Sequence, residues 1–255
     1  MINNNNIKII CLFTFLISCK TDFIKNQAYE KIPFFLCIGQ SNMAGRAIMT
    51  NNDTLVIDNV FLFNENQKWE PAKNPLNRFS TVRKKIGMQQ IGPSWSFAKE
   101  IVKKEKKIGL VVNARGGTSI KEWKKGGLLY NEAVIRVLQA QKKGNLKGIL
   151  WLQGSADRKE WFEYAQRFKL FVQNLRNDLN SSQVPIFVSE IGNWKNTSDS
   201  INYVISNLNN HVPNLVAIEV SDLPHLGDTI HFNRDSQIEI GKRFAKKYFE
   251  FINNY

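Results

Sequence analysis

The residues best suited to covalent chemistry are Ser41, Asp228 and His231. Ser41 follows a glycine-containing turn at the end of an apolar run, which places its hydroxyl where a strand leads into a helix and backbone N–H groups favour negative charge. An alcohol needs a neighbouring base before it attacks an acyl carbon at neutral pH, and histidine is the usual base. Asp228 precedes His231 by three residues, a spacing that lets the carboxylate orient the imidazole. These residues predict acyl-transfer chemistry on a serine.

Each of these residues also has an ordinary structural alternative. Ser41 could be a helix N-cap, and His231 could be a surface histidine that hydrogen-bonds at a helix end without a catalytic role. The other histidines are weaker candidates for the base, because His211 is predicted at a helix end before Pro213 and His225 lies in the loop Leu223-Pro224-His225, outside the segment that holds Asp228 and His231. α/β-Hydrolases share the order Ser, Asp, His, but their serine lies in Gly-x-Ser-x-Gly and their acid is far from the histidine. Here acid and histidine share one loop.

Four segments, each expected at the end of a strand, together resemble a known family. They are Gly39-Gln40-Ser41-Asn42-Met43-Ala44-Gly45-Arg46, then Ala114-Arg115-Gly116-Gly117-Thr118-Ser119-Ile120 with Trp123 following, then Trp151-Leu152-Gln153-Gly154, and finally Asp228-Thr229-Ile230-His231-Phe232. In this order they resemble the signature of the sialate O-acetylesterase and acetylxylan esterase group, which is the sixth carbohydrate-esterase family and a branch of the SGNH hydrolases.

This resemblance implies a carbohydrate O-acetylesterase that works through a serine acyl-enzyme. It implies that Ser41, Asp228 and His231 are catalytic, and that the oxyanion donors are the N–H groups of Ser41 and Gly116 and the side-chain amide of Gln153. The residue types fit, because glycine lets backbone approach a ligand closely and an amide donates without titrating. No metal-ligand spacing, phosphate-binding loop or dinucleotide motif occurs in the sequence, so no cofactor and no metal is expected.

One position departs from the family pattern. The family usually has Gln-Gly-Glu followed closely by Asp, whereas Ser155 stands here after Gln153-Gly154, with Asp157 beyond it. In some relatives that glutamate is regarded as the acid partner of the histidine, so Asp228 must carry this role, and Asp157 is left to support the loop or cap a helix. Two alternative functions follow: a catalytically impaired glycan-binding lipoprotein of the same fold, and an acetyl transferase.

Arg46, Arg115 and Trp123 are the candidate substrate-binding residues, with Trp151 beside them. Arginine suits a carboxylate or a set of hydroxyls, and aromatic faces suit sugar rings. Each tryptophan could equally belong to the core. The acetylated carbohydrate stays open between sialic acid and plant polysaccharides such as xylan or pectin.

The elements that position these residues predict an α/β fold. Short apolar runs alternate with longer segments of helical period, which is typical of a parallel sheet with helices on both faces. With the resemblance, this gives a three-layer, flavodoxin-like SGNH-hydrolase fold whose central parallel sheet has about five strands. We expect strands near 34–38, 108–112, 147–152, 184–189 and 215–220, a further strand at 59–63, an irregular segment over 64–91, and helices near 93–104, 129–142, 159–179, 199–210 and 234–252. Ligands of such sheets bind beyond the carboxyl ends of the strands.

The N-terminus predicts export. Residues 1–18 read as a lipoprotein signal peptide, because Lys8 precedes an apolar run too short to span a bilayer. The end of this run, Leu16-Ile17-Ser18-Cys19, resembles the bacterial lipobox. We therefore expect lipidation at Cys19, a tether over 19–31, and an esterase domain over 32–255 on the bacterial cell envelope, anchored in the membrane. The alternatives are an ordinary secretory peptide or a buried N-terminal helix. Cys37 is predicted to be a small buried hydrophobe.

The net charge of +13 comes largely from scattered lysine pairs. Such a distribution predicts solvated helix faces, and export argues against a nucleic-acid partner. An anionic glycan or a membrane surface is the alternative partner for a basic chain.

Overall fold

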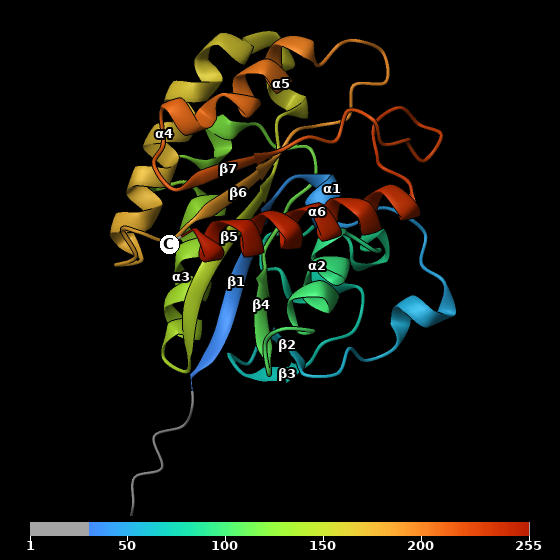
Figure 1. The fold of residues 1–255 in the computed structure, drawn as a ribbon, viewed down its shortest axis with the longest axis vertical. Coiled ribbons are helices and arrows are strands. Elements are labelled where there is room, and N and C mark those ends of the chain that lie inside the picture. Colours follow the sequence, from blue (N-terminus) through green and yellow to red (C-terminus); the bar gives the residue numbers. More distant parts are fainter. Residues whose placement is uncertain (1–30, 255) are drawn as a thin grey trace, which may run out of the picture. The chain divides into compact units, whose positions relative to one another are not determined.

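A computed structural model describes residues 31–254. The predicted signal peptide, the predicted lipidation site Cys19 and nearly all of the predicted tether lie outside this range. The described part contains a seven-stranded sheet in the order β3-β2-β4-β1-β5-β6-β7, in which β3 runs antiparallel to β2 and the other neighbours are parallel (Figure 1). The strands are β1 Ile32–Gly39, β2 Val60–Phe63, β3 Trp69–Pro71, β4 Ile108–Val112, β5 Gly144–Leu152, β6 Ile186–Ser189 and β7 Leu215–Ile218. The α-helices are α1 Ser41–Ala44, α2 Pro93–Ile101, α3 Leu128–Gln141, α4 Trp161–Asp178, α5 Asp199–Ser206 and α6 Arg234–Asn253.

The predicted α/β class is confirmed, and the strand number is corrected from about five to seven. The five strands expected with most support are β4, β1, β5, β6 and β7, which are neighbours in that order. The other two, β2 and β3, extend the edge beyond β4. The segment 64–91 was expected to be irregular throughout, but it contains β3. This strand is only three residues long, too short for a periodic signal, and its Pro71 suits an edge position.

Strand β1 shows why the core has two halves. Phe34, Leu36 and Ile38 pack toward α3, α4 and α5, whereas Phe35 and Cys37 pack toward α2 and α6. Figure 1 shows α2 and α6 together in front of the sheet, with α3 and α4 on its other side. A strand buried on both faces is apolar throughout, as parallel strands usually are. Burial raises the pKa of the Cys37 thiol to about 12, and the prediction that Cys37 is a buried hydrophobe is confirmed.

Strand β1 is the point from which the sheet extends to both sides. After β1 the chain builds the β4 side of the sheet, and from β5 onward it builds the opposite side. Parallel sheets bind ligands at the carboxyl ends of strands beside such a reversal. Ser41, Gly116 and Gln153 follow β1, β4 and β5, while the loop that holds His231 leads from β7 into α6. Among residues 31–254, no helix is long and apolar enough to cross a membrane.

Candidate active site

The turn after β1 holds Ser41 in a fixed place. Gly39 has φ 140°, and a Cβ at this position would collide with the carbonyl oxygen of Leu152 at the end of β5. Only glycine tolerates both conditions. The next residue, Gln40, donates its backbone N–H to the same Leu152 oxygen over 2.9 Å. Ser41 then begins α1 with 9% of its surface exposed. The hydroxyl is therefore anchored where β1 and β5 end.

His231 lies between the serine and the aspartate. Its Nε2 is 3.0 Å from Ser41 Oγ, and its Nδ1 is 2.6 Å from Asp228 Oδ2. An ionised carboxylate can only accept, so Nδ1 carries the proton and Nε2 of the neutral ring is left to accept from the serine hydroxyl. The structure thus brings together three side chains that are up to 190 positions apart in the chain.

Asp228 is held ionised by its own loop. Burial acts to raise the pKa of this carboxyl, but the backbone N–H groups of His231 and Ile230, together with the His231 ring, lower the pKa below its ordinary value. The two N–H groups donate to Oδ1 over 2.8 and 2.9 Å, which leaves Oδ2 to the imidazole. A carboxylate that is ionised at neutral pH can hold one histidine tautomer and stabilise the ring when it gains a proton.

Asn42 is a site residue whose role the sequence did not reveal. It is 1% exposed. Its Oδ1 accepts from the N–H of Phe232 at 3.1 Å and from Gln237 Nε2 at 3.3 Å, and its Nδ2 donates to the carbonyl of Ile230 at 3.2 Å. These bonds tie the residue after the nucleophile to both neighbours of His231. Asn42 therefore sets the spacing between the serine and the imidazole.

The loop after β4 lies against the nucleophile. Gly116 is buried, and a Cβ on it would lie 3.1 Å from Ser41 Cβ and 2.8 Å from Arg46 Nη2. The missing side chain therefore leaves space between the serine and the guanidinium. A Cβ on the following Gly117 would lie 3.4 Å from Lys84 Nζ. A cation therefore lies close to each glycine of this turn. Nothing in the sequence marks Lys84 beyond its place in the irregular segment.

Gln153 follows β5 as expected, but its side-chain amide does not point where the resemblance placed it. The side chain is fully buried, and its Nε2 donates one hydrogen to the carbonyl of Thr118 at 2.8 Å and the other to Asp157 Oδ2 at 2.6 Å. Both amide hydrogens are therefore committed, and the prediction that this amide donates to an oxyanion is corrected. The prediction that Asp157 supports the loop is confirmed, because the same carboxylate also accepts from the N–H of Ile120.

The prediction that Trp123 binds the sugar is wrong. It is fully buried, its Nε1 donates to Thr118 Oγ1 at 3.3 Å, and its ring packs edge-on against Trp151 with centroids 5.1 Å apart. Both tryptophans belong to the core, since neither presents a face that a sugar could stack on. Arg115 is half-buried beside Gly116, and its Nη1 donates to the carbonyl of Val82 at 2.8 Å.

Ser155, which replaces the family glutamate, bonds to the turn before the nucleophile. Gln40 Nε2 donates to Ser155 Oγ at 2.7 Å, and Gln40 Oε1 accepts from the N–H groups of Gly154 and Ser155 at 3.1 and 3.0 Å. The serine thus joins the β1 and β5 loops. Since Asp228 already fills Nδ1 of His231, the change at Ser155 does not leave the imidazole without an acid.

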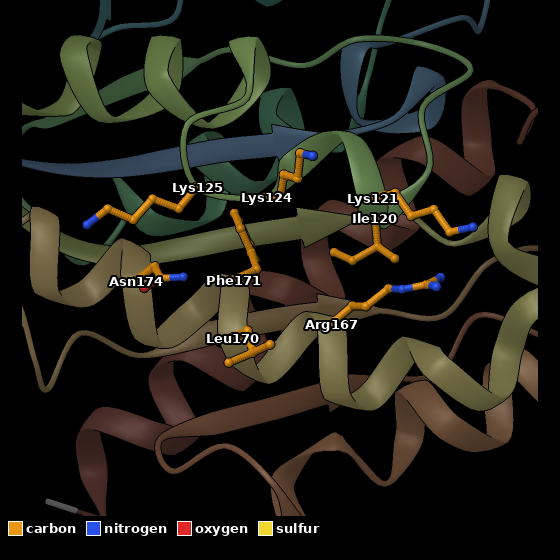
Figure 2. Close-up of a pocket in the computed structure, with 8 residues that line it drawn as sticks. All are labelled: Ile120, Lys121, Lys124, Lys125, Arg167, Leu170, Phe171 and Asn174. Atoms are coloured by element: carbon orange, nitrogen blue, oxygen red, sulfur yellow. The ribbon is translucent and has the colours of Figure 1, made fainter.

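A pocket of 490 Å³ lies away from these groups, between the segment 120–125 and helix α4 (Figure 2). Its lining consists of Ile120, Lys121, Lys124, Lys125, Arg167, Leu170, Phe171 and Asn174. Carboxylates already neutralise most of its cations, because Glu160 pairs with Lys121 and Arg167, and Asp178 pairs with Lys125. Within residues 31–254 no group of His, Cys, Asp and Glu side chains is arranged to hold a metal ion.

Comparison with known proteins gives one consistent family. Residues 31–250 match the family model described as carbohydrate esterase, sialic acid-specific acetylesterase. A probable carbohydrate esterase of Arabidopsis thaliana is 30% identical over an alignment of 249 residues that covers 88% of this chain and 94% of the relative. An X-ray structure of an Arabidopsis thaliana protein gives a TM-score of 0.79 at 27% identity, covering 87% of this chain and 99% of that one.

More distant structures share the fold alone. A carbohydrate acetylesterase from Xanthomonas citri gives a TM-score of 0.62 at 16% identity, covering 84% of this chain and 55% of its own. A family two carbohydrate esterase from Cellvibrio japonicus gives 0.54 at 10% identity, covering 88% of this chain and 62% of its own. The sheet and its helices are therefore an arrangement common to several carbohydrate esterases.

Proposed function

Because the chain belongs to the family of sialic acid-specific acetylesterases, a family of carbohydrate esterases, we propose that it hydrolyses acetyl esters on a glycan through a covalent intermediate on Ser41. The observation that carries the proposal is the pair of contacts from one imidazole, 3.0 Å to the Ser41 hydroxyl and 2.6 Å to the Asp228 carboxylate. A serine, a base and an orienting acid in this geometry are the requirements for acyl transfer.

The first step forms the acetyl-enzyme. His231 Nε2 takes the hydroxyl proton as Ser41 Oγ bonds to the acetyl carbon, and the resulting imidazolium faces the charged Asp228. The carbon–oxygen bond to the sugar then breaks, and the same proton passes to the departing sugar oxygen. In the second step water gives a proton to His231 and its oxygen to the acetyl carbon. Acetate leaves, and the proton returns to Ser41 Oγ.

The negative oxygen of each tetrahedral intermediate needs donors. The backbone N–H groups of Ser41 and Gly116 are the proposed donors, because Gly116 lies against Ser41 with no side chain between them. A well-aimed donor of this kind is worth roughly 3 kcal/mol of barrier. The amide of Gln153 is not among them, since its hydrogens are already donated to Thr118 and Asp157.

The finer part of the proposal is an acetylated sugar that carries a carboxylate, such as a sialic acid. Arg46 Nη2 lies close to Gly116, and Lys84 Nζ lies close to Gly117. Burial lowers the pKa of Arg46, which reflects the unfavourable desolvation of its charge and makes an anionic partner favourable there. A neutral polysaccharide would leave both cations without a partner from the substrate.

Acetate release from O-acetylated sialosides, acetylated xylan and acetylated pectin tests the proposal. We expect turnover that Ser41→Ala abolishes and that Asp228→Asn lowers by several orders of magnitude, because the amide favours the wrong histidine tautomer. Lys84→Ala is expected to raise KM for sialosides while leaving KM for xylan unchanged. Equal turnover by wild type and Ser41→Ala would exclude the serine mechanism.

The same assay separates the alternative functions. Activity that appears only in Ser155→Glu would support the catalytically impaired glycan-binding protein, and acetyl groups found on added glycans instead of in acetate would support the transferase.

For the N-terminus we propose lipidation at Cys19 and a place on the bacterial cell envelope. The support is the lipobox-like sequence that ends at this cysteine. Incorporation of a labelled fatty acid in a bacterial host is expected for the wild type and is expected to be lost in Cys19→Ser. Equal labelling of both proteins would exclude Cys19 as the lipidated residue.

A further inference from the structure

The loop that carries Asp228 is closed by backbone pairing at its base. His225 and Phe232 form an isolated antiparallel bridge, the N–H of Leu226 donates to the carbonyl of His231 at 2.7 Å, and the N–H of Asn233 donates to that of Pro224 at 3.3 Å. Asp228 lies near the tip of this loop, with its side chain 39% exposed. The base of the loop alone does not fix the direction of this side chain.

The imidazole of His225 bonds to the backbone on both sides of Asp228. Its Nδ1 accepts from the N–H of Gly227 at 2.9 Å and from the N–H of Thr229 at 3.3 Å. Both donors have left-handed backbone, with φ 116° for Gly227 and 56° for Thr229. This conformation is rare for a β-branched residue such as Thr229, so it persists only where other contacts impose it.

The His225 ring is itself held in place. Trp194 packs against it at 5.3 Å between ring centroids and against Phe232 at 5.0 Å, and Trp194 Nε1 donates to the carbonyl of Leu223 at 2.8 Å. The acceptor nitrogen therefore has a defined position relative to the amides that it binds.

We propose that His225 is a positioning residue for the acyl-transfer reaction, acting through Asp228. Its Nδ1 lone pair fixes the amides before and after Asp228, so that Oδ1 meets the N–H groups of Ile230 and His231 while Oδ2 meets the His231 ring. Only a ring that is unprotonated at Nδ1 can accept these bonds. This inference rests on the proposed function, and it gives a second histidine a role that is separate from proton transfer.

Two substitutions at this position separate the acceptor from the rest of the side chain. In His225→Asn, the Oδ1 atom stands close to the place of Nδ1 and can accept both amides. His225→Leu fills a similar volume without an acceptor. Misplacement of a catalytic group by about 1 Å can cost on the order of 100-fold in rate, so we expect His225→Leu to lower kcat on 4-nitrophenyl acetate about 10- to 100-fold, with KM changed less than about 2-fold. We expect His225→Asn to stay within about 5-fold of wild type.

Controls keep this pattern distinct from lost folding. His211→Leu removes an exposed histidine outside the loop and is expected to match wild-type kcat. Hydrogen exchange of residues 226–231 is expected to be faster in His225→Leu than in His225→Asn, at equal exchange elsewhere. If His225→Leu does not fold, His225→Gln, whose acceptor is displaced by one bond, replaces it with the same expectation.

The outcomes also separate this inference from the proposed function. Wild-type kcat in His225→Leu, or an equal loss in the Leu and Asn variants, would overturn the positioning role while wild-type turnover still supports the esterase. A wild type without turnover would overturn the proposed function, and unchanged loop exchange in His225→Leu would show independently that the histidine does not hold the loop.

Discussion

Replacement of Asn42 by alanine tests whether the nucleophile turn and the His231 loop are physically coupled. The change removes three hydrogen bonds and leaves the buried N–H of Phe232 without its acceptor. An unsatisfied buried donor costs about 1–3 kcal/mol, and the bonds to Gln237 and Ile230 add roughly 0.5–1.5 kcal/mol each. We therefore expect a loss of about 3 kcal/mol in the free energy of unfolding. For a domain of this size that is a fall of about 6–12 °C in Tm.

The same substitution is expected to affect the rate separately from stability. Without the Asn42 side chain, no hydrogen bond from that residue holds the His231 loop against the nucleophile turn, and the 3.0 Å contact between Ser41 Oγ and His231 Nε2 loses this support. We therefore expect kcat to fall about 10- to 100-fold at a temperature where the variant is folded. Asn207→Ala is the matched control, because Asn207 is only partly buried and donates to the carbonyl of Tyr203 at the C-terminal end of α5, far from the His231 loop in the sequence. This control is expected to stay within about 0.5 kcal/mol of wild type.

Thermal melts and initial rates on 4-nitrophenyl acetate measure both quantities for Asn42→Ala and its control. If Asn42→Ala melts with the wild type and keeps its kcat, Asn42 does not couple the nucleophile turn to the His231 loop. If it melts early but keeps kcat when folded, Asn42 contributes to stability only.

Three further predictions follow from buried groups. The Arg234 guanidinium is the main reason why the pKa of the buried Asp53 is held at about 2; the stability from this pair is therefore present above about pH 4 and lost as pH falls toward 2. Arg234→Ala is accordingly expected to cost about 3 kcal/mol at pH 7 and progressively less in urea melts below about pH 4, whereas a pH-independent cost would contradict the pairing. Trp123→Ala is expected to lower stability by about 3–5 kcal/mol with little change in KM, since the ring is in the core, and a rise in KM in a variant of unchanged stability would restore it to the sugar site. The thiol of Cys37, with its pKa raised to about 12, is expected to react with iodoacetamide at pH 8 only after unfolding, as peptide mass spectrometry would show, and rapid native labelling would exclude its burial.

The sheet and the main reacting groups could be predicted from the sequence because their signals are local. Apolar runs mark the five neighbouring strands β4, β1, β5, β6 and β7. The three-residue spacing between Asp228 and His231 places acid and base on one loop. The short strand β3 could not be predicted, since three residues carry no period.

Side-chain directions within the site were less predictable. Gln153 occupies the expected position at the end of β5, yet its amide turns toward Asp157 and Thr118. Such a choice depends on which buried acceptors fold around the side chain, and sequence spacing does not encode that. The same holds for Asn42 and His225, whose partners are backbone amides in irregular loops. Trp123 shows that a tryptophan in a substrate-facing motif can still belong to the core.

If the hydroxyl of Ser41 carries the acetyl group during turnover, the acetyl-enzyme can be trapped. Wild-type protein would be quenched in acid during turnover of 4-nitrophenyl acetate, digested and analysed by mass spectrometry. We expect one added acetyl group on the peptide that contains Ser41, and no such adduct in Ser41→Ala. Sustained turnover with the acetyl group on another residue, or with the same adduct in Ser41→Ala, would contradict catalysis through the Ser41 hydroxyl.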